Sequence, residues 1–224
     1  MTFSRSIEDY IKAIYELRGA GDRVSSTALS AKLGVTPASV TGMIKRMAHE
    51  RPDLVDYAPH HGVVLTAEGE AIALRIVRRH RLVELFLSTA LGYSWDEVHE
   101  EAERLEHVIS SKLEERIAGY LGHPAVDPHG DPIPTRDGTV DKPGHRALSS
   151  LDPGRDGRIR RVASSDEKLL QYLSDLGLVL GARLSVTEKA PFGGPVHLEV
   201  RGDAGVVTRV IGRNVAEQIF VEPE

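Results

Sequence analysis

The sequence contains no cysteine. This absence excludes disulfides, zinc–thiolate fingers, iron–sulfur clusters and cysteine nucleophiles, so any metal site must use oxygen and nitrogen ligands. Long apolar runs are missing as well, and 27% of the residues are charged, so we do not expect a membrane protein. The N-terminal residues lack the apolar segment and cleavage site of a secretory signal, which makes the cytoplasm the expected compartment.

An excess of positive charge is also absent. The chain carries 28 Lys and Arg against 33 Asp and Glu, a net charge of −5. Binding to nucleic acid would therefore need a local basic surface rather than the field of the whole molecule. The length of 224 residues allows two or three compact units.

The residue pattern changes along the chain and predicts four segments. Residues 1–74 combine short helical patterns with a β-like stretch, and residues 75–140 are dominated by helical periodicity. Residues 141–157 are rich in Pro, Gly and Asp and are expected to be a linker. Residues 158–224 contain short β-branched runs between turns, which predicts a small β-barrel. The expected fold class is α+β, mainly α.

A helix-turn-helix pattern lies near the N-terminus. Residues 6–17 predict a first helix with Ser6 as its cap. Residues 25–33 predict a second helix that is capped by Ser25 or Ser26 and ended by Gly34. Thr36 and Pro37 then cap and open a third helix, because proline at the first helical position loses no hydrogen bond. The short turn before the third helix is typical of the motif that places this helix in a DNA major groove.

The expected DNA-binding surface combines small polar residues with two basic ones. Small residues at the start of the third helix allow close approach to base edges, while Lys45 and Arg46 can reach phosphates. Residues 54–69 predict a two-stranded hairpin, the wing. We expect the following residues to face double-stranded DNA: Ser26, Thr27, Thr36, Pro37, Ala38, Ser39, Thr41, Gly42, Lys45 and Arg46. A three-helix core that binds no nucleic acid is the alternative, but cap, turn, polar face and wing in this order favour DNA binding.

Carboxylates and imidazoles gather beside the apolar stripe of a helix predicted through residues 98–113. They are His99, Glu103, Glu106 and His107. His80 and Glu84 form a second inward pair on the preceding helix. Buried carboxylates must be protonated, paired with arginine or bound to a cation. A solvated acidic face or a core histidine explains each residue singly, but the two helices together favour a divalent metal site.

Six motifs follow one another along the chain. They are EDYIKAIYEL, LGVTPASVTGMIKRM, GVVLTAEGE, RRHRLVELFL, EAERLEHVIS and GHPAVDPHGDPIP, and the predicted barrel comes after them. In this order they resemble the diphtheria toxin repressor family of metal-dependent regulators, over nearly the whole chain. The resemblance implies an N-terminal winged helix-turn-helix domain, a helical dimerisation and metal-binding domain, and a C-terminal SH3-like barrel. It also implies a homodimer that represses transcription at palindromic operators when loaded with Fe²⁺ or Mn²⁺.

The resemblance assigns the primary metal site to Asp9, Glu103, Glu106 and His107, with His80 adjacent. In the iron-type members of the family that this chain resembles, methionine occupies the position of Asp9 and cysteine occupies the position of Glu103. Two oxygen ligands instead resemble the manganese branch, because carboxylates suit Mn²⁺ and no sulfur favours thiophilic ions. We expect Mn²⁺ as corepressor, with Fe²⁺ as the alternative and other divalent ions binding in vitro. The resemblance also places Lys12 at the position where compact manganese regulators carry a glutamate that bridges two ions. A lysine there argues against a two-ion site.

The resemblance also implies a second metal pocket. Its residues would be Glu84, Asp127, His129 and Asp166, with His99 and His123 in reserve. An alternative for Asp166 is a helix-dipole role in the first turn of residues 164–177.

The sequence leaves two rival functions open. A winged-helix regulator that senses an organic ligand would bind DNA regardless of a metal chelator. A di-metal enzyme on a helical bundle would need Glu-x-x-His motifs on two helices. Neither Glu103 nor Glu106 stands three residues before His107, so we expect no catalytic residue.

Overall fold

The computed structural model describes residues 3–18, 23–141, 143–202 and 205–224. It divides into two compact units, each assembled from segments that are distant in the sequence. The first unit consists of Met1–His80, Glu106–Ile109 and Pro134–Thr139. The second unit consists of Arg81–Leu105, Ser110–Ile133 and Val140–Glu224.

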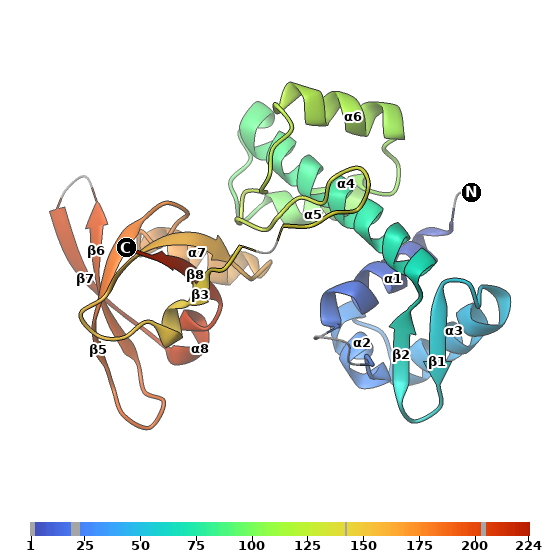
Figure 1. Cartoon of the computed structure of the whole chain (residues 1–224), viewed down its shortest axis with the longest axis horizontal. Coiled ribbons are helices and arrows are strands. Elements are labelled where there is room, and N and C mark those ends of the chain that lie inside the picture. The colour runs from blue at the N-terminus through green and yellow to red at the C-terminus, as the bar shows by residue number, and fades with distance from the viewer. Residues whose placement is uncertain (1–2, 19–22, 142, 203–204) are drawn as a thin grey trace. The chain divides into compact units, whose positions relative to one another are not determined.

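The first unit begins with three helices and a hairpin in the order of a winged helix-turn-helix (Figure 1), and the first part of the next helix follows them. The elements are α1 (Arg5–Leu17), α2 (Ser26–Leu33), α3 (Pro37–Glu50), β1 (Val55–Ala58) and β2 (Gly62–Leu65). The two strands pair antiparallel, with Val55 opposite Leu65. Their core includes Ile11, Leu29, Ile44 and Val63, all at most 1% exposed. Burying each such side chain stabilises the fold by about 1.5–3 kcal/mol.

Local capping fixes the boundaries of α2 and α3 as predicted. Ser25 Oγ accepts a hydrogen bond from the backbone N–H of Ala28, and Gly34 ends α2 in the left-handed conformation with φ 65°. Thr36 Oγ1 accepts from the N–H of Ser39, directly before Pro37 opens α3. The expectation for α1 was wrong in detail, because this helix begins at Arg5 and Ser4, not Ser6, occupies the cap position.

The middle of the chain forms α4 (Ala67–Leu91), α5 (Val98–Leu105) and α6 (Ser111–Tyr120). The single helix predicted through residues 98–113 is therefore wrong, and residues 106–108 form a turn. Two β-branched residues in this stretch, Val108 and Ile109, have low helix propensity. Ser110 then caps a new helix, since its Oγ accepts from the N–H of Leu113 at 3.2 Å.

The C-terminal part of the second unit is a six-stranded antiparallel sheet with the strand order β3-β8-β4-β5-β6-β7 (Figure 1). The strands are β3 (Arg146–Ala147), β4 (Asp156–Val162), β5 (Arg183–Lys189), β6 (Val196–Gly202), β7 (Gly205–Ile211) and β8 (Ile219–Pro223). Three short helices accompany them: η1 (Leu148–Ser150), α7 (Glu167–Asp175) and α8 (Arg213–Ala216). We call this part the sheet domain. It confirms the predicted α+β class with a small SH3-like C-terminal domain.

The sheet domain starts earlier than the sequence pattern indicated. Strand β3, helix η1 and the first residues of β4 lie within residues 141–157, the expected linker. Leu148 and Leu151 are buried there, 0% and 4% exposed, in the same core as Ile159 and Leu198. These apolar side chains order a segment whose Pro and Gly content predicted a linker.

Candidate metal centre

Three side chains of the first unit converge on one point. Asp9 lies on α1, whereas Glu106 and His107 lie in the turn that follows α5. One ligand atom from each lies within 4.8 Å of the other two. His107 Nε2 is 2.9 Å from Asp9 Oδ1 and 3.3 Å from Glu106 Oε1. Three of the predicted primary ligands are thus brought together in the tertiary structure.

Two of the converging atoms are buried without a hydrogen bond. Glu106 Oε1 and His107 Nε2 have no hydrogen-bond partner within the described part of the chain. A buried polar atom left in this way costs about 1–3 kcal/mol. Two carboxylate oxygens and an imidazole nitrogen that face a common point form a donor set suited to Mn²⁺ or Fe²⁺. The residues present therefore fit a divalent ion.

Glu8 orients the imidazole of His107. Glu8 Oε2 lies 2.7 Å from His107 Nδ1, and both side chains are largely buried. The carboxylate accepts a hydrogen bond from Nδ1, and in the neutral imidazole this arrangement would leave the lone pair of Nε2 for a metal. We did not predict Glu8 from the sequence. No periodicity signal could have identified it, because the contact joins residues 99 positions apart.

Lys12 and His80 occupy the opposite side of the Glu106 carboxylate. Lys12 Nζ donates a hydrogen bond to Glu106 Oε2 at 2.8 Å. His80 Nδ1 is 2.6 Å from the same oxygen and 3.0 Å from Lys12 Nζ. Lys12 and His80 are 5% and 6% exposed. The two oxygens of Glu106 therefore have different surroundings, with Oε2 engaged by Lys12 and His80 and Oε1 facing Asp9 and His107.

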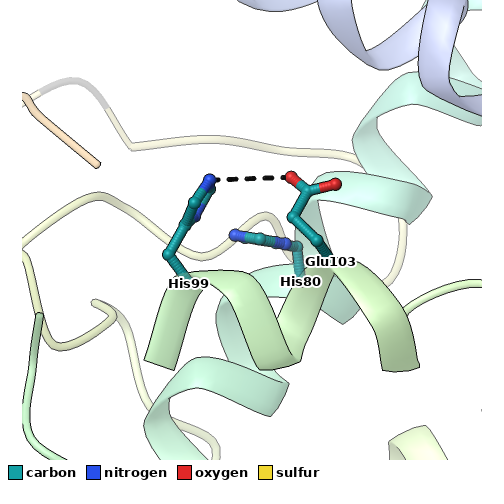
Figure 2. Close-up of side chains that lie close together, drawn as sticks. All are labelled: His80, His99 and Glu103. Atoms are coloured by element: carbon teal, nitrogen blue, oxygen red, sulfur yellow. Dashed lines mark ion pairs between the residues drawn. The ribbon is translucent and has the colours of Figure 1, made fainter. Parts of the chain in front are cut away.

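Glu103 does not belong to the converging group of the first unit. It lies one helical turn from His99 on α5, and α5 belongs to the second unit. Glu103 Oε1 is 3.7 Å from His99 Nε2, the pair joined by the dashed line in Figure 2. His80, also drawn in Figure 2, comes from α4. The assignment of Glu103 as a metal ligand stays a prediction.

The second unit contains another group of potential ligands, formed by Glu84, Asp127 and His129. Their ligand atoms lie within 4.8 Å of one another, and the residues are only 2%, 4% and 4% exposed. His99 adjoins the group, with its Nδ1 3.1 Å from Glu84 Oε1. Four of the residues predicted for a second pocket are therefore neighbours in this unit.

Hydrogen bonds hold the imidazole of His129 and the loop 127–131 in place. His129 Nε2 is 2.7 Å from the backbone carbonyl oxygen of Trp95. A carbonyl can only accept, so Nε2 carries the proton and Nδ1, 3.9 Å from Glu84 Oε2, presents a lone pair. The carbonyl of His129 accepts from the N–H of Val162 in β4, at 2.9 Å. This bond attaches the loop to the sheet domain.

Burial destabilises the charged form of the Asp127 carboxylate. Desolvation, together with the negative charges of Glu84 and Asp131, raises the pKa of Asp127 to about 7, although Arg81 and His129 oppose the shift. Arg81 Nε lies 3.5 Å from Asp127 Oδ2. A divalent cation beside Asp127 and Glu84 would relieve their repulsion.

Within the described part of the chain, the group formed by Glu84, Asp127 and His129 does not include Asp166 or His123, the other residues predicted for this pocket. Asp166 is exposed and caps α7, because its Oδ1 accepts a hydrogen bond from the N–H of Leu169 at 3.0 Å. His123 is exposed, with a positive φ of 55°. The structure thus gives Asp166 the helix-terminal position that the sequence left as its alternative.

The residues predicted to face DNA are mostly exposed. Lys45, Arg46 and the small residues Ala38, Ser39 and Gly42 are exposed on α3. Thr41 is half-buried, and its hydroxyl donates to the carbonyl of Pro37 at 2.9 Å. The remaining members are Thr27, Thr36 and Pro37, which are exposed, and Ser26, which is half-buried.

Arg23, which we did not predict, braces the wing. Its guanidinium donates to the backbone carbonyls of Asp56 and Gly62 at 3.1 and 3.3 Å.

Among the described residues, no helix is both long and apolar enough to cross a membrane.

Three protein-family models match successive parts of the chain. Residues 2–63 match the N-terminal DNA binding domain of iron dependent repressors, and residues 66–135 match their metal binding and dimerisation domain. Residues 146–223 match the FeoA domain. The last match includes β3, in agreement with the early start of the sheet domain.

Individual proteins are similar over most of the chain. The iron-dependent repressor IdeR of Mycobacterium tuberculosis is 33% identical over 211 residues, which are 89% of this chain and 90% of that protein. A solved manganese-dependent transcriptional repressor in complex with manganese is 39% identical, with a TM-score of 0.88 over 97% of this chain and 100% of its own. The manganese regulator SloR is 33% identical, with a TM-score of 0.79 over 97% and 98%.

Proposed function

Because this chain belongs to the family of iron-dependent repressors, we propose that divalent manganese is the corepressor that controls its binding to DNA. The chain is a metal-dependent DNA-binding transcriptional repressor that regulates metal homeostasis. Its similarity is to regulators rather than to enzymes. The choice of Mn²⁺ over Fe²⁺, the ligands and the operator symmetry are our proposals.

The primary ion would be held by Asp9, Glu106 Oε1 and His107 Nε2. Support comes from the convergence of these atoms and from the two that are buried without a hydrogen bond. Glu103, the remaining predicted ligand, would offer a further carboxylate. All these donors are oxygen or nitrogen, and carboxylate-rich sites suit Mn²⁺ better than sites with sulfur. Fe²⁺ is the alternative, and IdeR is a relative named for iron.

The primary site would control DNA binding through α1. Asp9 belongs to α1 of the winged helix, whereas Glu106 and His107 belong to the turn between α5 and α6. When bound, the ion would supply positive charge that attracts the ligand atoms of all three residues. Residues from α1 and from the turn would then be held together, which restricts the spacing of the two α3 helices in a homodimer. A palindromic operator accepts recognition helices separated by about one turn of DNA, roughly 34 Å.

A second ion would be held by Glu84, Asp127 and His129, with His99 beside them. Support comes from their burial, from the lone pair of His129 Nδ1 and from the raised pKa of Asp127. The carbonyl of His129 accepts a hydrogen bond from the N–H of Val162 in the sheet domain. An ion bound by His129 would therefore also order the loop that contacts this domain.

Operator binding across metals tests the proposal. An operator is first selected from random DNA with the Mn²⁺-loaded protein, and its affinity is then titrated with Mn²⁺, Fe²⁺, Co²⁺ and Zn²⁺ at one fixed salt concentration. We expect a chelator to abolish high-affinity binding and Asp9→Ala to remove the Mn²⁺ dependence. Glu16→Ala, at an exposed acid on the same helix that pairs with Lys32 at 2.8 Å, is the matched control.

The rival regulator that senses an organic ligand makes the opposite prediction. Its binding to the operator would be indifferent to the chelator, and Asp9→Ala would behave like Glu16→Ala. Either result would contradict a metal corepressor at this site.

A further inference from the structure

We propose that Lys12 sets the metal affinity of the primary site, as a fixed positive charge that holds Glu106 Oε2 and leaves only Oε1 for a single ion. This inference rests on the proposed metal site of Asp9, Glu106 and His107. It adds a residue that weakens ion binding, so that the site responds to changes in metal concentration instead of staying saturated.

The position of Lys12 is unusual for a lysine. Its side chain extends from α1 into the interior and is only 6% exposed, although most lysines lie in solvent. Nζ contacts two buried groups, Glu106 Oε2 at 2.8 Å and His80 Nδ1 at 3.0 Å. The ammonium is therefore held by the same carboxylate that presents its other oxygen to Asp9 and His107.

This contact determines how Glu106 can bind an ion. With Oε2 engaged by Lys12 and His80, only Oε1 is without a hydrogen bond. Glu106 would then bind through one oxygen, whereas a free carboxylate can supply both. Fewer oxygen contacts lower the affinity for Mn²⁺, and they leave ligand positions for water.

The charge of Lys12 acts in the same direction. An ion on Oε1 and the ammonium on Oε2 would share one carboxylate, so the two positive charges would be close together in a region screened little by water. Their repulsion opposes metal binding. A purely structural ion pair makes the opposite prediction, because its removal would leave Glu106 without its partner and disorder the site.

Direct Mn²⁺ titration of the full chain, without DNA, distinguishes these roles. Lys12→Gln keeps a hydrogen-bond donor for Glu106 and removes the charge, and Lys12→Met removes both. We expect each to lower the Kd for Mn²⁺ at least tenfold, with a thermal melt confirming the fold. Lys32→Gln, which removes an exposed lysine paired with Glu16 at 2.8 Å, should leave the Kd within twofold. An unchanged or higher Kd in the folded Lys12 variants would overturn the proposal.

Crystals of the unaltered protein with Mn²⁺ give a test that needs no variant. We expect the ion on Glu106 Oε1, with Lys12 Nζ still within hydrogen-bond distance of Oε2. An ion bound by both oxygens of Glu106, or a displaced Lys12, would contradict the inference. Failure of the metal site itself looks different, because Asp9→Ala would then leave Mn²⁺ binding to the otherwise native chain unchanged.

Discussion

Glu8 Oε2 lies 2.7 Å from His107 Nδ1, although the two residues are 99 positions apart in the sequence. The contact joins α1 to the turn after α5, next to the point where Asp9, Glu106 and His107 converge. Histidines that bind metals commonly donate their second N–H to a carboxylate in this way. Glu8 would therefore support His107 from outside the proposed set of ligands.

Glu8→Ala should weaken Mn²⁺ binding about 10- to 100-fold, the usual effect of removing such an outer carboxylate. The imidazole of His107 would lose both its orientation and its preferred tautomer. Isothermal titration with Mn²⁺ measures the change, and Glu16→Ala on the exposed side of α1 is the control. Equal affinities for the two variants would show that Glu8 does not support the site.

Asp127 should make the stability of the metal-free protein depend on pH. Its pKa is raised from the ordinary value of 3.8 to about 7, so the folded state keeps a proton that the unfolded state releases. Stability should therefore fall as the pH rises from about 4 to 7. Thermal melts in chelator across this range measure the fall.

Asp127→Asn is the matched variant for that measurement. The amide oxygen can still accept from the N–H groups of His129 and Asp131, which donate to Asp127 Oδ1 at 2.8 and 2.9 Å. We expect a flatter dependence on pH and, near pH 7, a melting temperature at least equal to that of the native chain. A slope as steep as the native one would exclude Asp127 as its source.

Gly130→Ala should detach the loop 127–131 from the sheet domain. Gly130 has φ +83°, and a Cβ there would lie 2.0 Å from the carbonyl oxygen of Arg160. Gly181 has the same φ with no atom within 4 Å of its Cβ position, so Gly181→Ala isolates the backbone strain. In urea unfolding, Gly130→Ala should lower the free energy of unfolding by about 1–3 kcal/mol more than Gly181→Ala does, which is the usual cost of overpacking. Equal destabilisation of the two variants would mean that the loop moves freely away from β4.

Lys45→Ala should weaken binding to specific and non-specific DNA by similar factors. Lys45 is exposed on α3 and is expected to contact phosphate rather than a base. The slope of log affinity against log salt should become shallower by about 1 for each phosphate that the protein no longer neutralises. Lys32→Ala on α2 is the control. An unchanged salt slope would place Lys45 away from the DNA backbone.

Capping and periodicity predicted the winged helix well because they act over a few residues. The sequence alone predicted Ser25 or Ser26 as the cap and Gly34 as the end of α2, and Thr36 with Pro37 as the start of α3. The same kind of signal failed at residues 106–108. There the apolar stripe continues through a turn, and helical spacing persists although the helix has ended.

By itself the sequence determined which atoms are available to a metal ion, since a chain without cysteine offers no thiolate and relies on oxygen and nitrogen from residues such as Asp9, Glu106 and His107. Only the tertiary structure decided how these groups are supported, with Glu8 on His107 and Lys12 on Glu106. The physical reason is distance along the chain. Caps and periodicity depend on near neighbours, whereas the contacts of Lys12 and Glu8 join residues 94 and 99 positions apart and exist only once the core has packed.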